Sequence, residues 1–148
     1  MTDDPLYRRE ILRLAADAAG AGHLPAPDAA ATARNPACGD QVSVELAVED
    51  GRVTALAHAT QACVLTQASA ALLAVKAPGR TRAELAALAE DVRGFLKGGV
   101  APEGYQVFDG VAQHAGRHVC VLLPLEAALK ALKPAEEGAV GAERQAGV

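Results

Sequence analysis

The chain has 148 residues, of which 51% are hydrophobic and 22% are charged, so it can form one globular domain with a buried core. Its net charge of −4, with basic and acidic residues interspersed, argues against nucleic acid as a partner. Its first residues, "MTDDPLYRRE", lack the apolar stretch expected of a signal sequence, and no apolar run approaches the roughly 18 residues of a membrane span. We therefore expect a cytoplasmic protein without a membrane partner.

The first half of the chain predicts a helix followed by antiparallel strands. Asp4 and Pro5 are a typical helix start, and the apolar residues that follow at helical spacing predict a helix over residues 5–19. The Gly- and Pro-rich segment after it predicts a loop, which includes one short strand near residues 29–34. Alternating apolar and polar residues on either side of "EDGR" then predict a hairpin over residues 41–60.

The middle of the chain predicts two helices in succession. Small residues and leucines at helical spacing predict that the first begins at Cys63. Thr81 and Glu84 form a T-x-x-E capping box at the start of the second, and Gly98 and Gly99 end it.

The last third predicts an extended piece, a long helix and a tail. We expect residues 105–111, "YQVFDGV", to be extended. Pro124 is tolerated in a helix only within the first turn, which places the start of the last helix near residues 120–123. Residues 134–148 lack anchoring hydrophobic side chains, so we expect a single domain over residues 1–133 and a disordered tail.

Three cysteines, Cys38, Cys63 and Cys120, are an odd number in a chain without a secretion signal, which disfavours a disulfide framework. Cys63 and Cys120 stand at predicted helix starts and Cys38 in a Pro/Gly turn, where backbone N–H groups lower a thiol pKa. Because the predicted hairpin lies between Cys38 and Cys63, it can bring these two thiols together. All three positions favour thiolates, which bind metals and act as nucleophiles.

Asp40 is the natural fourth ligand beside these cysteines. Zinc takes four ligands and iron–sulfur clusters need about four anionic donors, so three cysteines leave one position open. Gly39 lets the backbone turn so that Cys38 and Asp40 can face a common centre. A carboxylate oxygen is a harder ligand than a thiolate sulfur, so the Asp40 side chain could dissociate from zinc or iron. Spacing alone leaves an alternative equally open, in which the cysteines are unrelated small core residues.

Three motifs in order, "NPACGD", "ACVLTQASA" and "GRHVCVLLPLEAALKAL", resemble those of the U-type iron–sulfur cluster assembly proteins, the IscU, SufU and NifU N-terminal family. The resemblance covers about residues 5–132. It implies an α+β fold with a small antiparallel three-stranded sheet packed against several α-helices. It also implies that zinc or a [2Fe–2S] cluster is held by four residues: Cys38, Asp40, Cys63 and Cys120.

Details of the resemblance favour the zinc-binding SufU branch. Val119 stands where the scaffold branch has a histidine, and "HAGRHV" replaces that branch's "LPPVK" chaperone-recognition stretch. Arg117, three residues before Cys120, and the long segment 76–112 match the SufU pattern. The resemblance then implies a zinc-dependent sulfur acceptor, in which Cys120 receives persulfide sulfur from a SufS-like cysteine desulfurase and Arg117 supports it. Arg117 could instead pair with an acid such as Asp109.

Two other functions fit the same four ligands. A scaffold would build a labile [2Fe–2S] cluster and transfer it to apo iron–sulfur proteins or other Suf components. A zinc-binding interaction module would take no part in sulfur chemistry. In each case the protein would be an assembly factor or a binding module rather than a classical enzyme.

Several polar residues near the motifs have a functional and a structural interpretation. His118, two residues before Cys120, could be a swinging ligand or proton donor, but a histidine beside an arginine is more often solvated. Thr66, Gln67 and Ser69 could donate hydrogen bonds to bound sulfide, although small polar residues are common on tightly packed helices. Three further histidines have no partner at ligand spacing and are expected to be structural or solvated: His23, His58 and His114.

Overall fold

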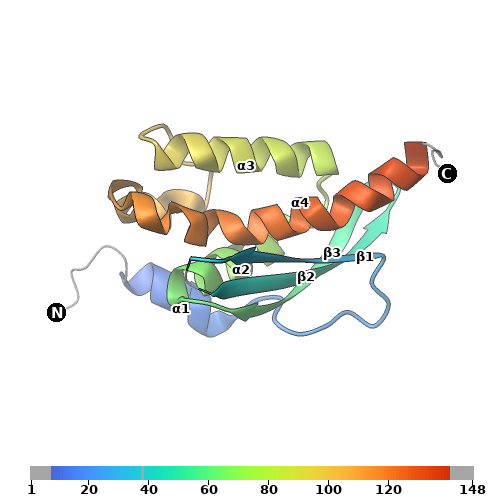
Figure 1. The fold of residues 1–148 in the computed structure, drawn as a ribbon, viewed down its shortest axis with the longest axis horizontal. Coiled ribbons are helices and arrows are strands. Elements are labelled where there is room, and N and C mark those ends of the chain that lie inside the picture. The colour runs from blue at the N-terminus through green and yellow to red at the C-terminus, as the bar shows by residue number, and fades with distance from the viewer. Residues whose placement is uncertain (1–7, 38, 141–148) are drawn as a thin grey trace.

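The computed structural model describes residues 8–37 and 39–140. Figure 1 shows a three-stranded sheet with helices layered over it, and α3 lies outermost, beyond α4. The predicted α+β fold with a small antiparallel three-stranded sheet is therefore confirmed. Within the described residues, no helix is both long and apolar enough to cross a bilayer.

The sheet consists of β1 (Ala29–Asn35), β2 (Asp40–Glu49) and β3 (Arg52–Gln61), in the order β1-β2-β3. The predicted hairpin and the short strand before it are both confirmed. Asp50 and Gly51 form the turn between β2 and β3 with φ of 54° and 78°, the two positive values that the tight hairpin turn with Asp-Gly requires.

Alternation along β2 sets which face of the sheet is buried. Val42, Val44 and Leu46 are buried, whereas Ser43 and Glu45 on the opposite face are only partly covered. The buried face packs against α4, with α2 against β3. Register pairs Asn35 with Asp40, so the β1–β2 turn lies at the end of the sheet where β3 finishes.

The helices are α1 (Arg9–Asp17), α2 (Val64–Lys76), α3 (Arg82–Leu96) and α4 (His118–Val140), with the 3₁₀ helices η2 (Tyr105–Gln113) and η3 (Ala115–Arg117) before α4. The capping box of α3 is confirmed: the Glu84 amide donates to Thr81 Oγ1 at 3.1 Å, and the Thr81 amide donates to Glu84 Oε1 at 3.0 Å. The predicted start of the first helix at residues 5–7 lies outside the described residues.

The prediction that residues 105–111 are extended is wrong, because they belong to η2. Tyr105, Phe108 and Val111 recur every three residues and are all fully buried. A 3₁₀ helix has three residues per turn, so it places these three side chains on one face toward the core.

The last helix begins earlier than its prediction. It begins at His118, which puts Pro124 in the second turn rather than the first. At the other end it runs to Val140, and the domain boundary expected at residue 133 stays a prediction. The remainder of the expected tail, residues 141–148, lies outside the described residues.

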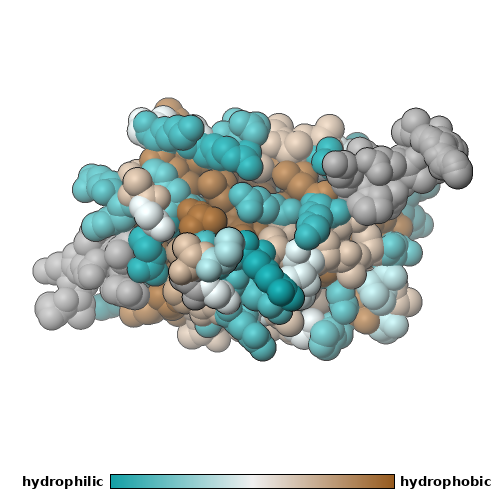
Figure 2. Space-filling view, viewed as in Figure 1, coloured by the Kyte–Doolittle hydropathy of each residue, from teal (hydrophilic) through white to brown (hydrophobic). Residues whose placement is uncertain are grey.

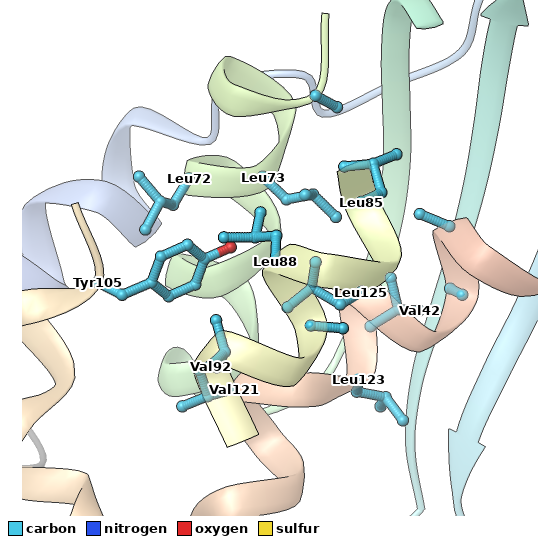
Figure 3. Packing of buried hydrophobic residues seen from close by; sticks show 14 of the residues in the cluster. Val42, Leu72, Leu73, Leu85, Leu88, Val92, Tyr105, Val121, Leu123 and Leu125 are labelled. Atoms are coloured by element: carbon cyan, nitrogen blue, oxygen red, sulfur yellow. The ribbon is translucent and has the colours of Figure 1, made fainter. Parts of the chain in front are cut away.

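Aliphatic side chains from every layer meet in one core around α2. Figure 3 shows this packing, in which Leu72 and Leu88 lie beside the ring of Tyr105 and Val42 of the sheet lies across the cluster from it. Alanines on α2 allow its neighbours to approach closely, and most of the helix is buried. On the surface, Figure 2 shows a hydrophilic outer side of α3, with apolar surface where α3 meets α4.

Replacing Tyr105 with phenylalanine is expected to leave the free energy of unfolding unchanged or to raise it by about 1 kcal/mol. The Tyr105 hydroxyl is buried without a hydrogen-bond partner among the described residues, and burial raises its pKa. The substitution keeps the ring, whose centroid lies 6.1 Å from that of Phe108. Urea unfolding measures the effect, with Tyr105→Ala as a control that should lose about 3–5 kcal/mol. A loss above about 1 kcal/mol in Tyr105→Phe would show that the hydroxyl has a partner.

Candidate metal centre

Three of the four predicted ligands come together at one end of the sheet. Asp40 begins β2, Cys63 is the N-cap residue of α2, and Cys120 lies in the first turn of α4. A carboxylate oxygen of Asp40 and the Sγ atoms of both cysteines lie within 4.8 Å of one another. In a tetrahedral site with bonds of about 2.0–2.3 Å, the ligand atoms are about 3.3–3.8 Å apart. A small approach of these three side chains would therefore place them around a single metal ion.

The fourth predicted ligand, Cys38, lies outside the described residues. Its neighbours in the turn can be placed: Ala37 and Asp40 line the same hollow as the two cysteines. The hollow has a volume of about 340 Å³ and is lined by Asn35, Ala37, Asp40, Cys63, Gly116, Arg117 and Cys120.

Asn35 and Gly39 shape the turn that leads into Asp40. The Asn35 side chain accepts a hydrogen bond from the Ala37 amide at 3.1 Å, and its carbonyl accepts one from the Gly39 amide at 2.8 Å. Gly39 has φ of 81°, which confirms the prediction that a glycine is needed for the backbone to turn here. Sequence reasoning missed Asn35, although asparagine at the start of a turn commonly bonds to the amide two residues on.

The start of α2 holds Cys63 between two hydrogen-bonding side chains. Thr66 Oγ1 lies 3.5 Å from Cys63 Sγ. Gln67 donates from Nε2 to the Ala62 carbonyl at 2.9 Å. Cys63 is half-buried, whereas Cys120 is only 4% exposed. Of these two cysteines, the one on α2 is therefore the more accessible.

The two sulfur atoms and Arg117 form one charged group. The neighbouring Cys120 thiol lowers the pKa of Cys63, with further lowering by Thr66 and Arg117. The neighbouring Cys63 and burial raise the pKa of Cys120. Arg117 lines the same hollow as both cysteines. In the metal-free state, the pair therefore holds a thiolate on Cys63, a thiol on Cys120 and a cation beside both.

Metal-free protein is expected to react with iodoacetamide at Cys63 about 10-fold faster than at Cys120 at pH 7, because the thiolate is the nucleophile and Cys120 is buried. A Cys38→Ser chain isolates these two thiols, and peptide mass spectrometry follows each one. In urea the two rates should become equal. Equal rates in the folded chain, or faster reaction of Cys120, would contradict the assignment of the thiolate to Cys63.

The other predicted residues have separate partners. His118 Nε2 donates to the Ala112 carbonyl at 2.9 Å, and it is not among the described residues that converge on a metal position. Asp109, the alternative partner of Arg117, pairs with Arg8 at 2.6 Å instead. Arg117 thus faces the two sulfurs, while His118 ties α4 to η2.

The remaining histidines lie away from the site. His58 is buried, donates from Nε2 to the Ala19 carbonyl at 2.9 Å, and contacts Thr60 Oγ1 at 2.9 Å. Burial lowers the pKa of His58, which favours its neutral form. His23 pairs with Glu45 at 3.0 Å, and His114 is exposed. The expectation of structural or solvated roles agrees with these positions.

The sequence matches the NifU-like N-terminal domain over residues 6–116. The chain belongs to this family. The predicted kinship with the U-type proteins is thereby confirmed. The NifU-like N-terminal structure from Brucella abortus is 37% identical, with a TM-score of 0.85, and the likeness covers 90% of this chain and 96% of that one.

Two further relatives of this NifU-like domain carry informative names. A protein of Thermotoga maritima named iron–sulfur cluster assembly scaffold protein IscU is 27% identical over 132 residues, which are 86% of this chain and 93% of the relative. FiSufU of Fervidobacterium islandicum AW-1, named as a scaffold for the SUF system, has a TM-score of 0.79 at 20% identity, over 88% of this chain and 99% of that one. The second likeness shows the fold alone, so the SufU branch stays a prediction.

Proposed function

We propose that this protein is an iron–sulfur cluster assembly factor that acts as a Suf-type, zinc-dependent sulfur acceptor. Membership of the NifU-like N-terminal domain family supports the assembly role, as does likeness to a protein named an assembly scaffold. The observation that carries the proposal is the convergence of Asp40, Cys63 and Cys120 within 4.8 Å. A SufS-like cysteine desulfurase would be the sulfur donor.

Asp40, Cys63 and Cys120, joined by Cys38 from the adjacent turn, would hold the metal. Thiolates with one carboxylate suit tetrahedral zinc and also suit a [2Fe–2S] cluster. A bound zinc ion would neutralise the thiolates and keep them at fixed positions. The carboxylate is the hardest of the four donors, so it is the arm that would exchange most readily.

The chain's own part in sulfur transfer is to present a thiolate to the persulfide of the desulfurase. Without metal the thiolate lies on Cys63, but ligand cysteines are deprotonated when they bind a metal, so Cys120 would also be a thiolate in the loaded protein. The Cys120 thiolate, which we assign as the acceptor, attacks the terminal sulfur, so that a new S–S bond forms and the old one breaks. The proton stays on the transferred sulfur, and the desulfurase cysteine leaves as a thiolate. One persulfide replaces another, so no external oxidant or reductant is needed. Arg117, which lines the same hollow as both sulfurs, would stabilise the negative charge.

Stimulation of the cognate cysteine desulfurase is expected to disappear in Cys120→Ala, because the acceptor thiolate is gone. Alanine formation from cysteine measures turnover, and peptide mass spectrometry locates the added sulfur on the wild-type chain. The matched control His114→Ala, at an exposed residue, should stimulate like the wild type. Undiminished stimulation by Cys120→Ala would exclude Cys120 as the acceptor.

A scaffold role is the second candidate, since the Thermotoga maritima relative is named a scaffold protein and an oxygen ligand suits a labile cluster. Metal analysis and the visible spectrum of anaerobically purified protein distinguish the two. A colourless chain with about one zinc supports the acceptor, and brown protein with iron supports the scaffold. A zinc protein that stimulates no desulfurase would be an interaction module.

A further inference from the structure

One buried hydrogen bond joins the two helices that carry Cys63 and Cys120. Ser69 on α2 donates from Oγ to the Val121 carbonyl on α4 at 2.6 Å. Ser69 is fully buried. Its acceptor belongs to the residue directly after Cys120, and Ser69 itself lies in the helix that begins beside Cys63. The bond therefore links the backbones that position the two sulfurs.

Pro124 makes this link more important for α4. A proline has no N–H, so the Cys120 carbonyl lacks the helical donor that it would otherwise find four residues later. Proline also pushes against that carbonyl, which loosens the turn. The first turn of α4 is thus held less firmly by its own backbone, and the hydroxyl of Ser69 anchors it from outside the helix.

The residues next to Ser69 indicate that its hydroxyl group is there for its hydrogen bond and not only for its size. Ala68, Ala70 and Ala71 surround it in the chain and are buried, so an alanine would fit the same interface. A buried hydroxyl without a partner costs about 1–3 kcal/mol. At this buried position a serine is therefore no worse than an alanine for stability only if its hydroxyl makes a hydrogen bond.

We propose that Ser69 is a positioning residue that sets the separation of Cys63 and Cys120 through the Val121 carbonyl, and thereby tunes metal affinity. This inference rests on the proposed function. Losing the bond lets the first turn of α4 move relative to α2, so the two sulfurs no longer meet one ion at the spacing that it prefers. Outer-shell partners of this kind typically contribute 10–100-fold to metal affinity.

Chelator competition with zinc tests the proposal on the full chain. Ser69→Ala is expected to bind zinc about 10–100-fold more weakly than the wild type. It should also shift the sulfur-to-metal charge-transfer bands of the cobalt-substituted protein, a signature that a loss of stability alone would not move. The matched control is Ser43→Ala, which removes a 2.8 Å hydrogen bond to Thr32 within the sheet and should keep the wild-type affinity and spectrum.

Repeating Ser69→Ala in a chain that carries Pro124→Ala tests whether the effect depends on the proline in α4. Pro124→Ala restores an N–H for the Cys120 carbonyl, so Ser69→Ala should weaken zinc binding less in that background than in the wild type. Ser69→Ala with wild-type affinity and spectrum would overturn the proposal, as would the same loss in Ser43→Ala. An equal loss in both Pro124 backgrounds would overturn the part assigned to the proline. A wild-type chain that binds no zinc would instead refute the proposed function, and the inference with it.

Discussion

Cys63→Ser is expected to lower the zinc affinity of the protein by more than about 100-fold, because losing an outer-shell partner alone costs roughly 10–100-fold. The Cys63 sulfur lies within 4.8 Å of the Cys120 sulfur and of a carboxylate oxygen of Asp40. A serine hydroxyl stays protonated at neutral pH and is a poor ligand for zinc. Competition with a chromophoric chelator at pH 7 measures the affinity of the variant against the wild type.

Metal-free unfolding is the control for this substitution. Cys63 is half-buried at the start of α2, so exchanging its sulfur for oxygen should change the urea midpoint of the metal-free chain very little. The zinc-loaded wild type should unfold at higher urea than the zinc-treated variant, since a ligand bound only to the folded state stabilises it. Retention of zinc by Cys63→Ser at the wild-type affinity would remove Cys63 from the ligand set.

Gly20→Ala is expected to lower the free energy of unfolding by about 3 kcal/mol. Gly20 has φ of 79°, and a Cβ added there would lie 2.5 Å from Ala74 Cβ and 3.1 Å from the Leu56 carbonyl oxygen. Its carbonyl also accepts the His58 amide at 2.9 Å, so the segment cannot move away without breaking its bond to β3. Urea unfolding of the metal-free chain measures the loss.

Gly51→Ala separates the two causes. Gly51 has nearly the same φ, 78°, but nothing lies within 4 Å of an added Cβ. This control carries only the backbone strain and should lose about 1–2 kcal/mol. If the two variants lost the same amount, the close approach of Gly20 to α2 would contribute nothing to stability.

Local patterns accounted for much of the fold. Alternation at Val42, Val44 and Leu46 predicted the sheet, and the Thr81 capping box predicted the start of α3, because both signals arise between neighbours in sequence. The 3₁₀ segment from Tyr105 was missed because a three-residue apolar spacing over one short stretch does not exclude an extended strand. Pro124 misled the prediction for α4, because the packing of a buried helix against its neighbours can hold a proline beyond the first turn.

The site was partly predictable for the same reason. The hairpin between Cys38 and Cys63 indicated that distant thiols could meet, and the resemblance supplied Arg117. The proximity of Cys63, Cys120 and Arg117 in one hollow depends on how α2 packs against α4, which no local pattern encodes. The contribution of Ser69 is equally non-local, since its partner is a backbone carbonyl far along the chain.

The three described ligand positions all stand at the beginning of an element: β2, α2 and α4. One ion bound to them would close two long loops of the chain at once, which removes conformational freedom mainly from the unfolded chain. Loss of the metal would therefore make the first residues of β2, α2 and α4 more mobile and leave the opposite end of the sheet unchanged. The metal would therefore stabilise the local structure at this end of the domain as well as hold the thiolates for sulfur transfer. Loss of the metal would impair both.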